Sequence, residues 1–251
     1  RYDHSAILLH PNPKDLDETC RLLDLVRRRT GDKYFLMIHG DATYGIPGGS
    51  GMTEFAVSMM ERPQQLKDQA RKRVDRALER ARKLQEHGEL DGFALCADYC
   101  FNNGPFMRPA QFGEFVAPYL RDLIAGYRDM GFYTIKHTDG NIMPIIDQLV
   151  DTRPHALHSL DPQGGVDIAT VAAHYGDRVA LCGNVNCGLM QTGTEEECAA
   201  SARASLAGGM QAPGYIFCTS NCVYTGLALE RYELIHDIWR REGVRPQPAD
   251  G

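Results

Sequence analysis

The chain has 251 residues, of which 43% are hydrophobic and 24% are charged. This composition is typical of a globular protein and fits one large domain or two small ones. Lysine and arginine number 27 against 33 aspartate and glutamate, which gives a formal net charge of −6. No basic stripe interleaved with aromatic residues occurs, so nucleic acid is not expected as a partner.

No apolar run approaches the ~20 residues that a membrane-spanning helix needs, and the first five residues do not resemble a secretory signal. We therefore expect a soluble, cytoplasmic protein with no membrane partner. The eight cysteines are spread through strand and helix patterns of a chain large enough to fold without disulfides, so reduced thiols are expected. A buried strand pattern starts as early as residue 5, which suggests that an N-terminal portion is missing.

Short apolar runs alternate with long amphipathic segments along the chain. This alternation predicts the strands and crossover helices of a parallel α/β fold. The predicted strands lie near residues 6–9, 34–39, 92–97, 132–137, 156–159, 179–183 and 215–218. The predicted helices lie near residues 15–29, 64–87, 109–130, 142–152, 167–175, 195–207 and 229–242.

The longest predicted helix has one apolar stripe, and its many charged residues are expected on the outer face. The stripe consists of Leu66, Ala70, Val74, Ala77, Leu78, Ala81 and Leu84. Three helices are expected to end just before the next strand at a glycine, namely Gly88, Gly131 and Gly176. The glycine-rich segment 45–51 is predicted to be a mobile loop, and residues 244–251 a C-terminal tail.

Seven βα units in one series favour a closed eight-stranded (β/α)8 barrel over an open doubly wound sheet. The barrel is expected to be a single domain over residues 1–243, with its eighth strand either unrecognised or in the missing N-terminal portion. No strand is followed by G-x-G-x-x-G, and G-x-x-x-x-G-K-[ST] does not occur. Neither a dinucleotide site nor a P-loop nucleotide site is therefore indicated.

Polar residues follow the ends of six predicted strands. In a barrel, the carboxyl ends of all strands face one mouth, and active sites lie there. The candidate substrate-binding residues at these ends are His39, Asp41, Asn141, Asp161 and Asn184. Asp98 is a candidate for substrate binding or proton transfer, and a carboxylate that caps the next loop is an equal alternative.

His137 and Asp139 are separated by one residue, and both side-chain types are zinc ligands. The plainer alternative is a neutral histidine that is hydrogen-bonded to a carboxylate. Cys222 follows the last predicted strand in a polar turn, where its thiolate would complete a three-residue catalytic zinc site with an open fourth position. The alternative for Cys222 is a free thiol in a surface loop.

Several segments carry a resemblance to a known family. They are Cys96-Ala-Asp-Tyr, Asn103-Gly-Pro-Phe-Met-Arg-Pro, His137-Thr-Asp-Gly-Asn and Gly176-Asp-Arg-Val-Ala-Leu-Cys-Gly-Asn. In order and spacing they resemble the uroporphyrinogen decarboxylase superfamily over about residues 34–239. The resemblance implies a distorted (β/α)8 barrel. It also implies one of two activities, either metal-free decarboxylation or zinc-dependent transfer of methyl groups between corrinoids, thiols and related carriers.

The methyltransferases of this superfamily that act on methylcobamide and a thiol hold zinc with a His-x-Cys pair and a distant Cys. His137 and Cys222 match the first and last of these, whereas Asp139 stands where that pattern has Cys. A carboxylate makes the metal centre harder, so Asp139 is expected either to ligate the metal or to act as a general acid. The resemblance implies a methyltransferase of corrinoid-linked one-carbon metabolism, with zinc as cofactor and a corrinoid protein as partner.

Two alternatives stay open beside this interpretation. The first is metal-free decarboxylation of an acidic substrate, although the N-terminal arginine-rich motif and early aspartate of that branch are not found in this chain. The second is a non-catalytic barrel that acts as a binding subunit. The sequence does not name the methyl donor or acceptor, and it leaves the oligomeric state open.

Overall fold

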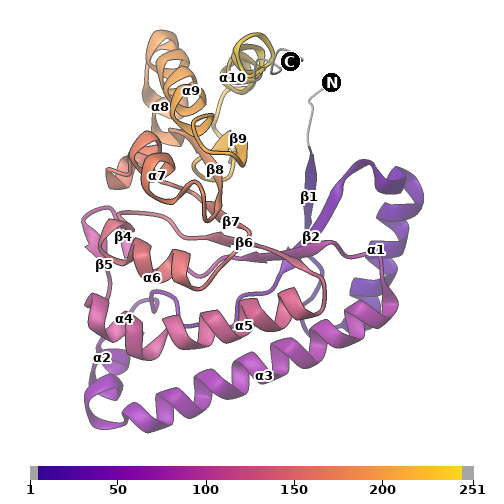
Figure 1. The fold of residues 1–251 in the computed structure, drawn as a ribbon, viewed down its shortest axis with the longest axis vertical. Helices are drawn as coiled ribbons and strands as arrows, with labels where there is room; N and C mark the ends of the chain where they lie inside the picture. The colour runs from indigo at the N-terminus through magenta and orange to yellow at the C-terminus, as the bar shows by residue number, and fades with distance from the viewer. Residues whose placement is uncertain (1–4, 245–251) are drawn as a thin grey trace. The chain divides into compact units, whose positions relative to one another are not determined.

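A computed structural model describes residues 5–244 of the chain. All but the first residue of the predicted C-terminal tail lies outside the described residues. Two compact units are formed (Figure 1). Within the described residues, unit 1 consists of 5–99, 106–137 and 145–155, and unit 2 of 100–105, 138–144 and 156–244. The single domain over residues 1–243 stays a prediction.

Four parallel strands form the sheet of unit 1, in the order β1, β2, β3, β6. Their bounds are β1 (Ala6–Leu9), β2 (Phe35–His39), β3 (Gly92–Leu95) and β6 (Tyr133–His137). All four residues of β3 are buried. Such continuous burial is typical of parallel strands that are covered on both faces, which is why the strands appear in the sequence as short apolar runs.

Helices of unit 1 follow the predicted alternation. They are α1 (Leu16–Thr30), α2 (Gly51–Glu61), α3 (Pro63–His87), α4 (Pro109–Phe115), α5 (Ala117–Asp129) and α6 (Ile146–Asp151), with the short 3-10 turn η1 (Gly31–Lys33). A second 3-10 turn, η2 (Met143–Ile145), begins in a segment of unit 2 and ends at the first residue of the last segment of unit 1. Helix α3 runs alongside α5 (Figure 1). A Cβ at Gly126 of α5 would lie 2.5 Å from Leu78 Cδ2, so glycine permits this close approach. The predicted stripe of α3 is largely confirmed, because Leu66, Ala70, Val74, Ala81 and Leu84 are buried.

Three predictions for unit 1 were wrong in detail. The helix predicted over residues 109–130 is interrupted at Val116, because Pro118 cannot donate the backbone hydrogen bond that a continuous helix needs. Helix α2 was not predicted after the glycine-rich segment. Strand β3 ends at Leu95, two residues earlier than predicted, so Asp98 lies in the segment that follows the strand.

Unit 2 contains three parallel strands in the order β7, β8, β9, with helices in between. The strands are β7 (Ala156–His158), β8 (Ala180–Val185) and β9 (Tyr215–Thr219). The helices are α7 (Ile168–Tyr175), α8 (Cys187–Thr192), α9 (Glu195–Gly209) and α10 (Leu229–Glu242), with the 3-10 turn η3 (Pro162–Gly164). Helix α8 and the hairpin of β4 (Cys100–Phe101) with β5 (Gly104–Pro105) were not predicted.

The core of unit 2 lies between β8 and helices α8, α9 and α10. It consists of Val185, Met190, Cys198, Ala202, Leu206, Ile235 and Ile238. Helix α9 begins at a capping box in which Thr194 and Glu197 satisfy each other's backbone N–H groups. Among the helices of residues 5–244, none combines the length and the apolar character that crossing a bilayer requires.

Candidate functional site

In unit 1, polar side chains follow the carboxyl ends of three neighbouring strands. Asp41 comes two residues after β2, Asp98 follows β3, and His137 is the last residue of β6. Successive residues of a strand point to opposite faces, so Lys136 and His137 diverge. The Lys136 side chain is fully buried, whereas 17% of the His137 side chain is exposed.

Asp41 and Lys136 form a buried ion pair. Lys136 Nζ donates to Asp41 Oδ2 at 2.8 Å and to the carbonyl oxygens of Leu95 and Ala97. Asp41 Oδ1 accepts hydrogen bonds from the Thr43 backbone N–H and hydroxyl, and Oδ2 also accepts from the Ala97 N–H. The carboxylate therefore accepts four hydrogen bonds from the protein itself, and these bonds hold the ends of β2, β3 and β6 together.

The ionised form of Asp41 is stabilised by this network. Burial alone would raise the pKa of the Asp41 carboxyl, but the Lys136 charge and the hydrogen bonds outweigh it, so the pKa lies below its ordinary value. Lys136 was not singled out from the sequence, although a lone charged residue within an apolar strand was an available signal. Substrate binding by Asp41 stays a prediction, because both of its oxygens are engaged by internal donors.

Asp98 and His137 form a more open pair. His137 Nε2 lies 3.6 Å from Asp98 Oδ1, and 46% of the Asp98 side chain is exposed. The Asp98 carbonyl oxygen accepts a hydrogen bond from the Ile46 N–H, which ties this segment to the loop after β2. An imidazole beside a half-exposed carboxylate can hold or pass a proton, and it can present ligands to a cation.

His39 has a different partner, the ring of His10. It is exposed at the end of β2, and its Nε2 is 3.2 Å from Nδ1 of His10. The histidine partner of His39 was not foreseen from the sequence. Substrate binding by His39 stays a prediction.

In unit 2, Asn221 connects Asp139 to the Cys222 turn. Its side-chain amide donates to Asp139 Oδ2 at 2.5 Å, and its Oδ1 accepts the Cys222 N–H at 2.6 Å. The Asn221 carbonyl oxygen accepts from the Thr219 hydroxyl and from Cys187 Sγ. Asn221 could not be singled out from the sequence, because a contact across 82 residues depends on the tertiary fold.

Three predicted substrate-binding residues of unit 2 make internal hydrogen bonds. Asp161 is buried, and its two oxygens accept the N–H groups of Gln163 and Gly140, the latter next to Asp139. Asn141 Oδ1 accepts the Met143 N–H, and the buried Asn184 side chain donates to the Leu160 carbonyl oxygen. The contacts of Asp161 and Asn141 hold the backbone that follows Asp139, at Gly140 and Met143. Direct contact of these residues with a substrate stays a prediction.

Burial separates the cysteines of unit 2. It raises the pKa of the Cys187 thiol and raises that of Cys182 to about 12, so both remain protonated at neutral pH. Burial also lowers the pKa of His158, whose ring is therefore neutral there. Cys222, in contrast, is exposed, as its polar turn predicted. Among these residues, Cys222 is thus the thiol best placed to reach an external ligand.

The residue types present suit a divalent metal ion. Asp98, His137 and Asp139 offer one imidazole nitrogen and two carboxylate oxygens, which is a donor set that zinc accepts. His137 and Asp139 are separated only by Thr138, so their Cα atoms lie at most about 7 Å apart. The residue types and the spacing of the predicted pair are therefore compatible with a shared ion, and metal binding by the pair stays a prediction.

Comparison with known proteins places the chain in a family. The family model described as uroporphyrinogen decarboxylase (URO-D) matches residues 42–241. A solved structure of a methyltransferase from Methanosarcina mazei is similar with a TM-score of 0.72 and 19% identity, over 92% of this chain and 71% of that chain. No curated protein sequence matches. The predicted α/β fold of this type is confirmed, and the chain belongs to the uroporphyrinogen decarboxylase family.

Proposed function

We propose that this protein is a methyltransferase of corrinoid-linked one-carbon metabolism. It moves a methyl group between a methylated corrinoid protein and a small donor or acceptor, at a zinc centre held by His137, Asp139 and Cys222. The family and the fold shared with the methyltransferase from Methanosarcina mazei support this proposal. The observation that carries it is Asn221, which joins two of the three proposed ligands, Asp139 and Cys222, through one side chain.

The protein residues have separate tasks in this proposal. Zinc, when bound, supplies a Lewis acid that holds the methyl acceptor and lowers its pKa. Asn221 orients the Asp139 carboxylate by donating to Oδ2, in the way that hydrogen bonds commonly orient metal ligands. Asp98 accepts a proton from, or returns it to, the substrate, because its carboxylate is half-exposed and adjoins His137.

The identity of the third ligand can be tested. A thiolate from Cys222 would give a softer centre, whereas a carboxylate from Asp98 would give a harder one. We favour Cys222 because it is exposed and because its backbone is anchored to the residue that binds Asp139. In this arrangement Asp98 stays available for proton transfer.

Metal content tests the proposal directly. Elemental analysis of protein expressed with zinc and purified without chelator should show about one zinc per chain. His137→Ala and Cys222→Ala should lower this content, whereas Cys20→Ala, a helix cysteine of α1, should not. If Asp98→Asn lowers the zinc content and Cys222→Ala does not, Asp98 is the third ligand. Wild-type protein without zinc would contradict the metal centre.

Decarboxylation of an acidic substrate is the second candidate, because the matching family model describes a decarboxylase. This activity predicts release of carbon dioxide that persists after treatment with a chelator. The methyltransferase proposal predicts instead a methyl-transfer activity that is lost after treatment with a chelator. If neither activity is found and binding of a partner survives His137→Ala, the result would favour a non-catalytic binding subunit.

A further inference from the structure

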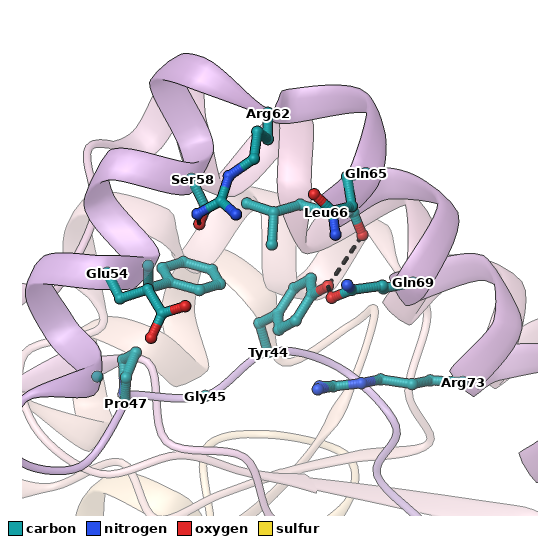
Figure 2. Close-up of a pocket in the computed structure, with 12 residues that line it drawn as sticks. Tyr44, Gly45, Pro47, Glu54, Ser58, Arg62, Gln65, Leu66, Gln69 and Arg73 are labelled. Atoms are coloured by element: carbon teal, nitrogen blue, oxygen red, sulfur yellow. Dashed lines mark hydrogen bonds between the residues drawn. The ribbon is translucent and has the colours of Figure 1, made fainter.

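Unit 1 contains a cavity of about 380 Å³ that none of the candidate site residues lines. It lies between the loop after β2 and the helices α2 and α3 (Figure 2). It is lined by Tyr44, Gly45, Pro47, Gly51, Glu54, Phe55, Ser58, Arg62, Gln65, Leu66, Gln69 and Arg73. This volume is in the range of small-molecule sites.

The cavity is cationic, although the chain as a whole is acidic. Arg62 and Arg73 line it together with a single carboxylate, Glu54, so its formal charge is 2 − 1 = +1, against −6 for the whole chain. Figure 2 shows Arg62 reaching toward Ser58, and Arg73 lying on the opposite side of Tyr44. Arg62 Nη2 donates to Ser58 Oγ at 3.0 Å, and the Arg73 guanidinium lies 4.6 Å from the Tyr44 ring centre. Both arginines are thereby held toward the cavity.

An apolar wall adjoins the two arginines. The rings of Tyr44 and Phe55 meet edge to face, with centres 5.1 Å apart. Tyr44 is buried, and its hydroxyl lies 2.9 Å from the Leu66 carbonyl oxygen and 3.3 Å from Gln69 Oε1. The hydroxyl has a single proton, which it donates to the nearer Leu66 carbonyl oxygen, and the side-chain amides of Gln65 and Gln69 also line the cavity. The cavity therefore combines an aromatic surface with cationic and amide donors.

We propose that this cavity binds a small organic carboxylate. The planar guanidinium fork matches the two oxygens of a carboxylate, so Arg73 holds the anionic end, while Arg62, on the opposite side of Tyr44, adds positive charge to the cavity. The apolar body packs against Tyr44 and Phe55. This inference does not depend on zinc or methyl transfer, since the cavity lies within unit 1 and shares no residue with the proposed metal ligands.

The cavity also adjoins, through the loop after β2, the segment that carries Asp98. The loop residues Tyr44, Gly45 and Pro47 line the cavity, and Ile46 in the same loop donates its N–H to the Asp98 carbonyl oxygen at 2.8 Å.

Titration calorimetry with benzoate tests this binding site in the full chain. Arg73→Ala should weaken benzoate binding roughly tenfold or more, because a charge-assisted hydrogen bond is lost, whereas Arg62→Ala should weaken it less, because it removes only a more distant charge. Arg76→Ala is the matched control, since Arg76 is an exposed arginine of the same helix that does not line the cavity. It removes the same charge and should leave the affinity unchanged. Zinc content should be equal in all four proteins.

Neutral and purely inorganic probes complete the test. Benzamide, which has the shape of benzoate without its charge, should bind at least roughly tenfold more weakly, and so should inorganic phosphate, which has no apolar body. The proposal is overturned if benzoate does not bind at about 10 mM. It is also overturned if Arg76→Ala weakens binding as much as Arg73→Ala, or if benzamide or phosphate binds as tightly as benzoate.

Discussion

Two aspartates follow neighbouring strands of unit 1 and have opposite surroundings. The Asp41 side chain, after β2, is 9% exposed and accepts four hydrogen bonds, one of them from the buried Lys136. The Asp98 side chain, after β3, is 46% exposed and has His137 at 3.6 Å. The same residue type at the same edge of a sheet is thus buried in a hydrogen-bond network in one case and half-exposed beside a histidine in the other, and only the second has a proton-transfer role in the proposed function.

The largest effect on stability is expected from Lys136→Met. This change leaves the Asp41 carboxylate buried without its counter-charge, which should cost about 3–5 kcal/mol of the free energy of unfolding. Urea unfolding measures the loss. Lys72→Met, at an exposed position of α3, should change stability by no more than about 0.5 kcal/mol. Equal stability of the two variants would refute a structural role for the ion pair.

Asp98→Asn should separate chemistry from stability. We expect methyl transfer to fall about 100-fold or more, because the proton-transfer group is lost. The free energy of unfolding should change by no more than about 0.5 kcal/mol, because the side chain is half-exposed. Kinetics and urea unfolding on the same preparation test both parts. A variant that is unstable but fully active per folded molecule would reverse the roles assigned to Asp98 and Asp41.

Asn221→Ala should weaken zinc binding about 10–100-fold, because the Asp139 carboxylate loses the donor that orients it. Competition with a coloured chelator measures this affinity. Asn102→Ala, at an exposed position between β4 and β5, is the control and should bind zinc as the wild type does. Unchanged affinity in Asn221→Ala would show that the asparagine supports only the turn.

The pH dependence of stability should carry a smaller contribution from Asp41. Its pKa in the folded protein is below the ordinary value of 3.8, so its stabilising contribution is complete above that value and is lost as the pH falls through the folded pKa. Asp41→Asn should therefore lower stability at neutral pH and flatten the loss of stability in acid. Urea midpoints between neutral pH and about pH 2 measure this. If the stability of Asp41→Asn falls with decreasing pH as steeply as that of the wild type, the stabilising role of the Asp41 carboxylate is contradicted.

Local patterns were sufficient for much of the fold and for part of the site. Hydrophobic periodicity identified the strands and most helices, because it depends on neighbouring residues alone. Strand ends likewise indicated His137 and Asp98. The pairing of Lys136 with Asp41 and of Asn221 with Asp139 could not be predicted, because each joins residues more than eighty positions apart.

The most direct test of the central claim is a spectrophotometric assay of cobalamin methylation and demethylation with the purified protein. Methylcobalamin is supplied with thiol acceptors in one direction, and reduced cobalamin with methyl donors in the other. The wild type should change the cobalamin spectrum only when zinc is bound. The rate of this change should be at least about 100-fold lower in His137→Ala, whereas Lys72→Met should keep the full rate. No spectral change with the zinc-loaded wild type, or an equal rate in His137→Ala, would contradict the account.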